Sequence, residues 1–164
     1  MRDVGGSLDG QQLRVAIAVS RYNETITRGL LDGARAALAE CGVPEGSLTV
    51  VHVPGALELP LAAQELAASG RHDAVVALGA VIRGETSHYD YVCSETARGC
   101  ARVALDAGVP VAFGVLTCDS LAQARDRASA TPKNKGAEAA RTAVEMANLL
   151  TLLRAPDGKS GRAP

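Results

Sequence analysis

The segment Ala74–Ile82, AVVALGAVI, contains nine apolar residues between Asp73 and Arg83. Its first part, residues 74–78, predicts a strand buried on both faces, because an apolar run without alternation has no side that faces water. The whole segment is about half as long as a membrane-spanning helix. It therefore indicates a central strand of a parallel sheet and argues against a membrane span.

Similar runs recur along the chain, each followed by an alanine-rich segment of helical period. The predicted strands are residues 13–19, 48–53, 74–78 and 111–115. The predicted helices are residues 25–40, 58–68, 91–107, 121–128 and 136–153. Gly42, Gly70 and Gly108 follow the first three helices and fit left-handed C-caps, and Ser120 with Gln123 predicts a capping box at the fourth.

This alternation of strands and helices predicts an α/β fold. We expect a three-layer sandwich of flavodoxin-like type, with a four-stranded parallel sheet and helices on both faces. The 164 residues suit one domain, which we place at residues 13–153. Residues 1–12 are interpreted as an N-terminal extension and residues 154–164 as a flexible C-terminal tail, because both are rich in Gly, Pro and small polar residues.

Composition narrows the function classes. Apolar residues make up 47% and charged residues 21%, and 17 basic against 18 acidic side chains leave a net charge of −1. Such a chain has no general field for nucleic acid or an anionic membrane, so we expect neither as a partner. The N-terminus lacks the apolar middle of a signal peptide, which favours a cytoplasmic location. The four cysteines lack paired spacing and are interpreted as reduced, mostly buried thiols.

Reactive and aromatic side chains gather in the loops that follow the predicted strands. Ligands of open parallel sheets bind at the carboxyl ends of the strands. The loops at that edge contain Tyr22, Glu58, Arg83, Thr86 and His88, and Phe113 lies on the last strand. The chain has only three Tyr and one Phe, so this concentration predicts a binding site at that edge.

The three histidines receive different interpretations. His52 lies inside a predicted strand and is expected in the core, whereas His72 lies on a surface turn and is expected in solvent. His88 follows a glycine-bearing loop beside the aromatic residues. It is either a structural residue or an acid–base catalyst, since imidazole titrates near neutrality. No second His or Cys stands at ligand spacing from it, so no metal site is predicted.

Phosphate-binding signals are weaker. The chain has neither a GxxxxGK[ST] loop nor GxGxxG after the first strand, so nucleotide-binding roles have no support. Residues 83–86 precede a helix, where free backbone N–H groups suit an anion. Arg127 and Lys135 flank the loop 128–134 and could pair with such an anion, although Arg127 taken alone also fits a solvated helix position.

Five segments, taken in order, resemble the lumazine synthase (6,7-dimethyl-8-ribityllumazine synthase) family. They are residues 21–23 (RYN), 53–60 (VPGALELP), 78–92 (LGAVIRGETSHYDYV), 114–117 (GVLT) and 134–140 (NKGAEAA). The resemblance implies the penultimate step of riboflavin biosynthesis. In this step 5-amino-6-(D-ribitylamino)uracil and 3,4-dihydroxy-2-butanone 4-phosphate condense to the lumazine, phosphate and water, without a metal or organic cofactor.

The resemblance also implies a site shared by neighbouring, identical subunits of a pentameric ring. His88 would be the acid–base residue. The pyrimidine and the ribityl chain would be bound by Tyr22, Ala56, Leu57, Glu58, Ala80, Val81 and Ile82, together with Phe113 and Lys135 of the neighbour. The phosphate would be bound by Glu85 and Thr86, together with Arg127 of the neighbour. Tyr22, Leu57 and Glu85 replace residues more common in the family, and Glu85 is expected to face solvent because its charge would repel phosphate.

The sequence leaves one alternative open for the function and one for the assembly. A non-catalytic lumazine- or flavin-binding protein could keep the same fold, but it would need neither the imidazole of His88 nor the cations of Arg127 and Lys135. The assembly could stop at the pentamer or continue to a shell of sixty subunits. Family members limited to pentamers tend to have an insertion before the last helix. Residues 127–136 have none, which favours the shell.

Overall fold

The structure is a computed structural model that describes residue 1 and residues 3–155. Its four strands are β1 (Val15–Ser20), β2 (Leu48–Val53), β3 (Ala74–Ile82) and β4 (Val111–Cys118). Its helices are α1 (Glu24–Glu40), α2 (Leu59–Ala68), α3 (His88–Ala107), α4 (Leu121–Ala128) and α5 (Lys135–Arg154). Short 3₁₀ turns, η1 (Glu45–Ser47) and η2 (Ala56–Glu58), flank β2.

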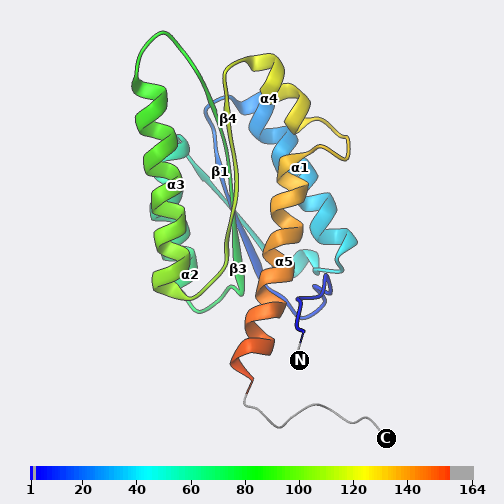
Figure 1. Ribbon diagram of the computed structural model, residues 1–164. Coiled ribbons are helices and arrows are strands. Elements are labelled where there is room, and N and C mark those ends of the chain that lie inside the picture. The colour runs from blue at the N-terminus through cyan, green and yellow to red at the C-terminus, as the bar shows by residue number, and fades with distance from the viewer. Residues whose placement is uncertain (2, 156–164) are drawn as a thin grey trace, which may run out of the picture.

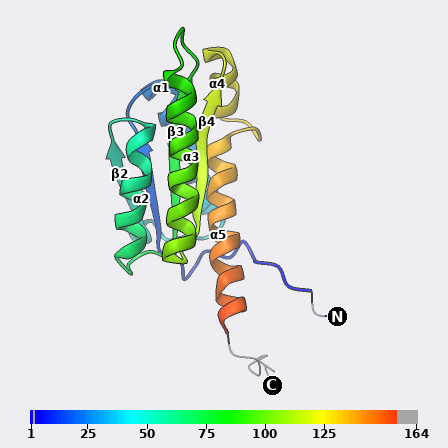
Figure 2. The ribbon, with the colours of Figure 1, turned by 60° about the vertical axis from the view of Figure 1, so that its left-hand side comes forward.

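The strands form one parallel sheet in the order β2-β1-β3-β4. Helices α2 and α3 cover one face, and α1, α4 and α5 cover the other (Figures 1 and 2). Successive residues of β1 point to opposite faces: Ile17 packs in the core below α1 and α5, and Ala18 in the core below α2. The predicted three-layer α/β sandwich is confirmed.

Most predicted boundaries agree with the structure, and two differences affect the site. Strand β3 continues past the predicted Leu78 to Ile82, and β4 past the predicted Val115 to Cys118, because their ladder continues as far as the pair Ile82↔Cys118. Helix α3 begins at His88 rather than Tyr91. His88 is therefore the first residue of a helix and not a loop residue.

The predicted glycine caps are present, but the predicted capping box is only half formed, because the Gln123 side chain accepts the Asp119 N–H and not the Ser120 N–H. Gly42, Gly70 and Gly108 have φ of 82°, 67° and 62°, the left-handed conformation that glycine adopts without strain. At α4 the Ser120 hydroxyl accepts the Gln123 N–H at 3.2 Å. All four cysteines are free, two buried and two half-buried.

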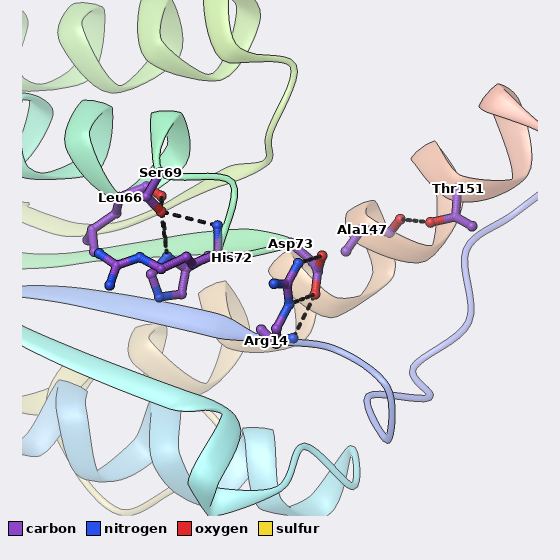
Figure 3. Close-up of polar contacts among 8 residues, drawn as sticks. Arg14, Leu66, Ser69, His72, Asp73, Ala147 and Thr151 are labelled. Carbon is purple, nitrogen blue, oxygen red and sulfur yellow. Dashed lines mark hydrogen bonds and ion pairs between the residues drawn. The ribbon is translucent and has the colours of Figure 1, made fainter.

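The predictions that His52 lies in the core and that His72 lies in solvent are both wrong. His52 is exposed, because β2 is an edge strand and its side chains have no helix above them on one side. His72 is only 7% exposed. Its Nδ1–H donates to the Leu66 carbonyl at 3.2 Å, and Nε2 forms a hydrogen bond of 3.1 Å with the Thr49 hydroxyl. Figure 3 shows His72 beneath Leu66 and Ser69.

The residues before β1 and the end of α5 lie below the amino ends of the strands, away from the loops that carry the candidate site (Figure 1). Residues before β1 pack on α5, where the Asn148 amide donates to the carbonyls of Ser7 and Asp9 at 2.9 and 2.8 Å. Arg154, assigned above to the tail, is the last residue of α5 and donates to the Gly108 carbonyl at 2.6 Å. The remainder of the predicted tail, residues 156–164, lies outside the described residues. None of the helices in the described chain has the length and apolarity required to cross a membrane.

Candidate active site

Tyr22 lies where β1 leaves the sheet. The Arg21 and Tyr22 N–H groups donate to the carbonyls of Val53 and Pro54 at 2.9 and 3.1 Å, so this turn continues the pairing of β1 with β2. The ring lies against Gly55, where an added Cβ would meet ring carbon Cδ2 at 2.8 Å. Glycine thus leaves room for a ring that remains 68% exposed. An exposed ring held in this way can stack on a flat ligand.

Asn23 joins that turn to the end of β3. It has a positive φ of 59°, which Asn tolerates better than most residues, and it forms the N-cap of α1. Its side-chain amide donates to the Ala80 carbonyl at 2.8 Å. Ala80 is buried, while Val81 and Ile82 after it are half-buried. The turn and the strand end therefore have a fixed relative position.

The η2 turn fixes the carboxylate of Glu58. Its Oε2 accepts the Gly55 N–H at 2.8 Å and so caps the start of the turn. Ala56 is buried beneath this turn, and Leu57 is exposed beside it. Glu58 itself is exposed, so a carboxylate of defined position faces outward near Tyr22.

The segment between β3 and α3 leads into the exposed N-terminus of α3. Glu85, Thr86 and His88 are all exposed there. The Thr86 hydroxyl accepts the His88 N–H at 3.4 Å, and the N-cap residue Ser87 makes no side-chain cap bond. Several backbone N–H groups at the start of α3 therefore keep their capacity to bind an anion.

A second group of residues lies beside the free edge of β4. Phe113, Arg127 and Lys135 line one hollow of ≈ 270 Å³, formed by β4, α4 and the first turns of α5. Phe113 is 42% exposed. The Lys135 ammonium pairs with the Glu138 carboxylate, and one Arg127 nitrogen donates to the Gln123 carbonyl at 3.1 Å. An aromatic ring and two cations thus share a concave surface.

Sequence reasoning assigned no role to Asn134, which supports this hollow. Its Oδ1 accepts the Ala137 N–H at 3.0 Å as the N-cap of α5. Its Nδ2 donates to the carbonyls of Gly29, Ala128 and Ser129 at 3.0, 3.1 and 3.0 Å. These bonds fix the loop between Arg127 and Lys135. An Asn directly before a helical run is the signal that could have identified it.

The predicted site residues therefore form two groups in one chain. Tyr22, Glu58 and His88 belong to the group at the carboxyl ends of β1–β3, and Phe113, Arg127 and Lys135 to the group along β4. Among the described residues, no side-chain hydrogen bond or ion pair joins a member of one group to a member of the other. One chain thus presents two groups of candidate site residues.

Two thiols near these groups are poor nucleophile candidates. Burial raises the pKa of Cys118, which lines the hollow beside β4, and the charge of Arg127 only partly offsets it. Burial likewise raises the pKa of Cys93 on α3, against the hydrogen bond from Tyr89. Both thiols stay protonated near neutral pH. In residues 3–155 we find no group of three or more His, Cys, Asp or Glu side chains placed to hold a metal ion.

Comparison with known families agrees with the geometry. The family model described as 6,7-dimethyl-8-ribityllumazine synthase matches residues 12–151. This span contains the whole sheet, all five helices but the last turn of α5, and both groups of candidate site residues. The resemblance seen in the sequence motifs is thereby confirmed: the chain belongs to the 6,7-dimethyl-8-ribityllumazine synthase family.

Proposed function

We propose that this protein condenses 5-amino-6-(D-ribitylamino)uracil with 3,4-dihydroxy-2-butanone 4-phosphate. The products are 6,7-dimethyl-8-ribityllumazine, inorganic phosphate and two molecules of water. The observation that carries the proposal is the family match over residues 12–151, because every residue assigned to the site lies inside it.

In this proposal the pyrimidine stacks on Tyr22 and is closed over by Phe113 of a neighbouring subunit. The exposed ring of Tyr22, held against Gly55, supports the first contact. The backbone of residues 80–82 binds the polar edge of the pyrimidine. Glu58 and the backbone of residues 56–57 bind the ribityl hydroxyls, for which a carboxylate of fixed position is a good acceptor.

The phosphate of the second substrate binds between the start of α3 and a neighbouring Arg127. Free N–H groups near Thr86 and His88 suit a dianion, and a guanidinium can bind it with two parallel bonds. Glu85 on the same segment is exposed, so its carboxylate can remain in solvent. Lys135 of the neighbour adds a second cation beside the ring system.

Each step of the proposed reaction moves a proton. The 5-amino group attacks the ketone and water leaves, which gives an imine. Loss of a proton from the adjacent carbinol carbon gives an enamine, which expels phosphate. The resulting enol becomes a ketone, and the ribitylamino nitrogen attacks it with loss of the second water. His88, exposed beside the phosphate-binding segment, accepts and returns these protons.

A shared site requires identical subunits side by side. The hollow with Phe113, Arg127 and Lys135 lies at the free edge of β4, where a neighbouring chain can reach it. The sheet of one chain would then supply the pyrimidine-binding loops, and the edge of the next would close them. This arrangement explains why one chain presents its candidate site residues in two groups.

Mixing the two substrates with the purified protein tests the proposal. We expect the absorbance of the lumazine to rise together with one equivalent of released phosphate, above the slow uncatalysed reaction. Binding of the lumazine without any acceleration would reject the enzyme and favour a binding protein of the same fold.

A further inference from the structure

Arg83 makes four contacts around residues 84–87, the segment proposed above to bind phosphate. The sequence alone assigned no specific role to Arg83. Its N–H donates to the Cys118 carbonyl at 2.9 Å, which extends the β3–β4 ladder by one bond. Its Nε donates to the Asp119 carboxylate at 2.9 Å and its Nη1 to Asp90 at 3.3 Å. Its guanidinium carbon lies 4.1 Å from the centre of the Tyr89 ring.

These contacts bind both ends of one segment. Residues 84–87 form neither helix nor strand and connect β3 to α3, as the long connection at the top of Figure 1 shows. Arg83 precedes the segment, and Tyr89 and Asp90 lie in the first turn of α3 after it. One guanidinium thus fixes the distance between the points where the segment leaves the sheet and enters the helix.

The same network continues into α4. The Asp119 N–H donates to the Gln123 side chain at 3.0 Å, and the Gln123 carbonyl accepts from Arg127 at 3.1 Å. Asp119 is therefore held from both sides, by the Arg83 guanidinium and by the first turn of α4. The orientation of residues 84–87 therefore depends on the Arg83–Asp119 ion pair, and Asp119 is itself fixed by α4.

Charge makes Arg83 important in a second way. Asp90, Asp119 and Glu85 place three carboxylates around residues 84–88, and Arg83 is the cation that pairs with the first two. Its Nε and Nη1 donate to these carboxylates, so two of its three nitrogens bind groups of its own chain. Without it, two carboxylates would remain uncompensated next to a site for a dianion.

We propose that Arg83 is a positioning residue for the phosphate-bearing substrate: through Asp119 and Asp90 it holds residues 84–88 in the anion-binding geometry. This inference rests on the function proposed above. It predicts that Arg83 acts on one of the two substrates, because the pyrimidine-binding residues Tyr22 and Glu58 are held by other contacts.

Steady-state kinetics of the full-length protein test this. Arg83→Met should raise KM for the butanone phosphate about five- to tenfold, the effect of losing two exposed ion pairs, and leave KM for the pyrimidine within twofold. Arg83→Lys, which keeps the charge, should restore most of the loss. Arg102→Met is the matched control, because Arg102 forms an exposed ion pair with Asp106, four residues later on α3. An equal rise in both KM values would overturn the proposal.

Asp119→Asn separates positioning from direct contact with phosphate. If Arg83 acts through Asp119, this variant raises the same KM, and the double variant with Arg83→Met is no worse than Arg83→Met alone. If Arg83 itself bound the phosphate, Asp119→Asn would free the guanidinium and remove a repelling charge. A lower KM in Asp119→Asn, or additive losses in the double variant, would therefore overturn the proposal.

Amide hydrogen exchange gives a measurement that needs no turnover. In Arg83→Met we expect faster exchange at residues 84–90, with and without inorganic phosphate, while residues of β1 and α5 keep the wild-type rates. Unchanged exchange at residues 84–90 would overturn the positioning role. Absence of turnover in the wild-type protein with this exchange pattern intact would instead reject the proposed function alone.

Discussion

The side-chain amide of Asn134 donates to the carbonyl of Gly29 at 3.0 Å, across 105 residues of chain. Asn134 is 4% exposed and caps α5, while Gly29 lies within α1. The contact requires small residues on α1, since a Cβ at Gly33 would lie 2.3 Å from Oδ1 of Asn134. One amide thus fixes the start of α5 against α1, and with it the position of Lys135.

Asn134→Ala should therefore be among the more destabilising single changes. It removes a helix cap and leaves the buried carbonyl of Ala128 without its side-chain donor, a combined loss of about 2–4 kcal/mol. Asn148→Ala is the control, because Asn148 is half-buried and bonds only the N-terminal segment. Urea unfolding at one protein concentration measures both. A loss in Asn134→Ala no larger than in Asn148→Ala would contradict the role of this cap.

The fold could be predicted from the sequence because its signals are local. Apolar runs define the strands. Gly42, Gly70 and Gly108 end their helices whatever other elements pack against those helices. The positions of His52 and His72 could not be predicted in this way. Which strand lies at the sheet edge depends on the order β2-β1-β3-β4, and His72 is buried by Thr49, 23 residues earlier.

The candidate site divides along the same line. The loops after β1 and β3 could be located from the predicted parallel strands alone, since all carboxyl ends of a parallel sheet meet at one edge. The bond from Asn134 to Gly29 and the bond from Arg83 to Asp119 join segments far apart in sequence, and a pattern in one segment contains no information about them. The division of the candidate residues into two groups likewise depends on the hollow beside β4, whose lining does not include Tyr22.

His88→Ala should slow the reaction without abolishing it. General acid–base catalysis contributes about 10²–10⁴-fold to a rate, whereas holding the two substrates together contributes as much or more and is retained. We expect kcat to fall by about 10²-fold or more, with smaller changes in both KM values. Single-turnover formation of the lumazine measures this step. A kcat within threefold of the wild type would show that His88 is not the proton carrier.

Arg127→Ala should affect one substrate selectively. Loss of a charge-assisted bond to an anion is worth about 1.5–3 kcal/mol, so KM for the butanone phosphate should rise about 10–100-fold. Arg125→Ala, two positions earlier on α4 and also exposed, is the matched control and should change neither KM beyond twofold. Parallel rises for both substrates in Arg127→Ala would remove Arg127 from the phosphate site.

The pair Arg14–Asp73 should make stability depend on acid pH. Burial alone would raise the pKa of Asp73, but hydrogen bonds from the Arg14 backbone and side chain outweigh it and hold the pKa below its usual value (Figure 3). A carboxylate with a lowered folded-state pKa stabilises the protein above its unfolded pKa, about 3.9, and this contribution is lost as the pH falls through the folded value.

Asp73→Asn should therefore be less stable than the wild type at pH 7 by about 1 kcal/mol, because the pair is partly exposed. The difference should close as the pH falls below about 4. Urea unfolding across this pH range measures the difference in stability. Asp106→Asn is the comparison, because Asp106 forms an exposed ion pair with Arg102 within one helix. A difference that stays constant between pH 7 and pH 3 would show that the carboxylate charge is not what stabilises this position.

The mass of the assembly tests the shared site and the shell together. A site that needs Phe113, Arg127 and Lys135 from a neighbour requires at least a ring. The connection between α4 and α5 is short, residues 129–134, and Asn134 ties its end to α1, so no inserted residues hold these helices apart. We therefore expect the shell of sixty subunits, with a mass of about 1 MDa for chains of 16.8 kDa. Sedimentation and light scattering at neutral pH distinguish the outcomes. A mass near five chains would reject the shell and keep the shared site, whereas a fully active particle of one chain would reject both.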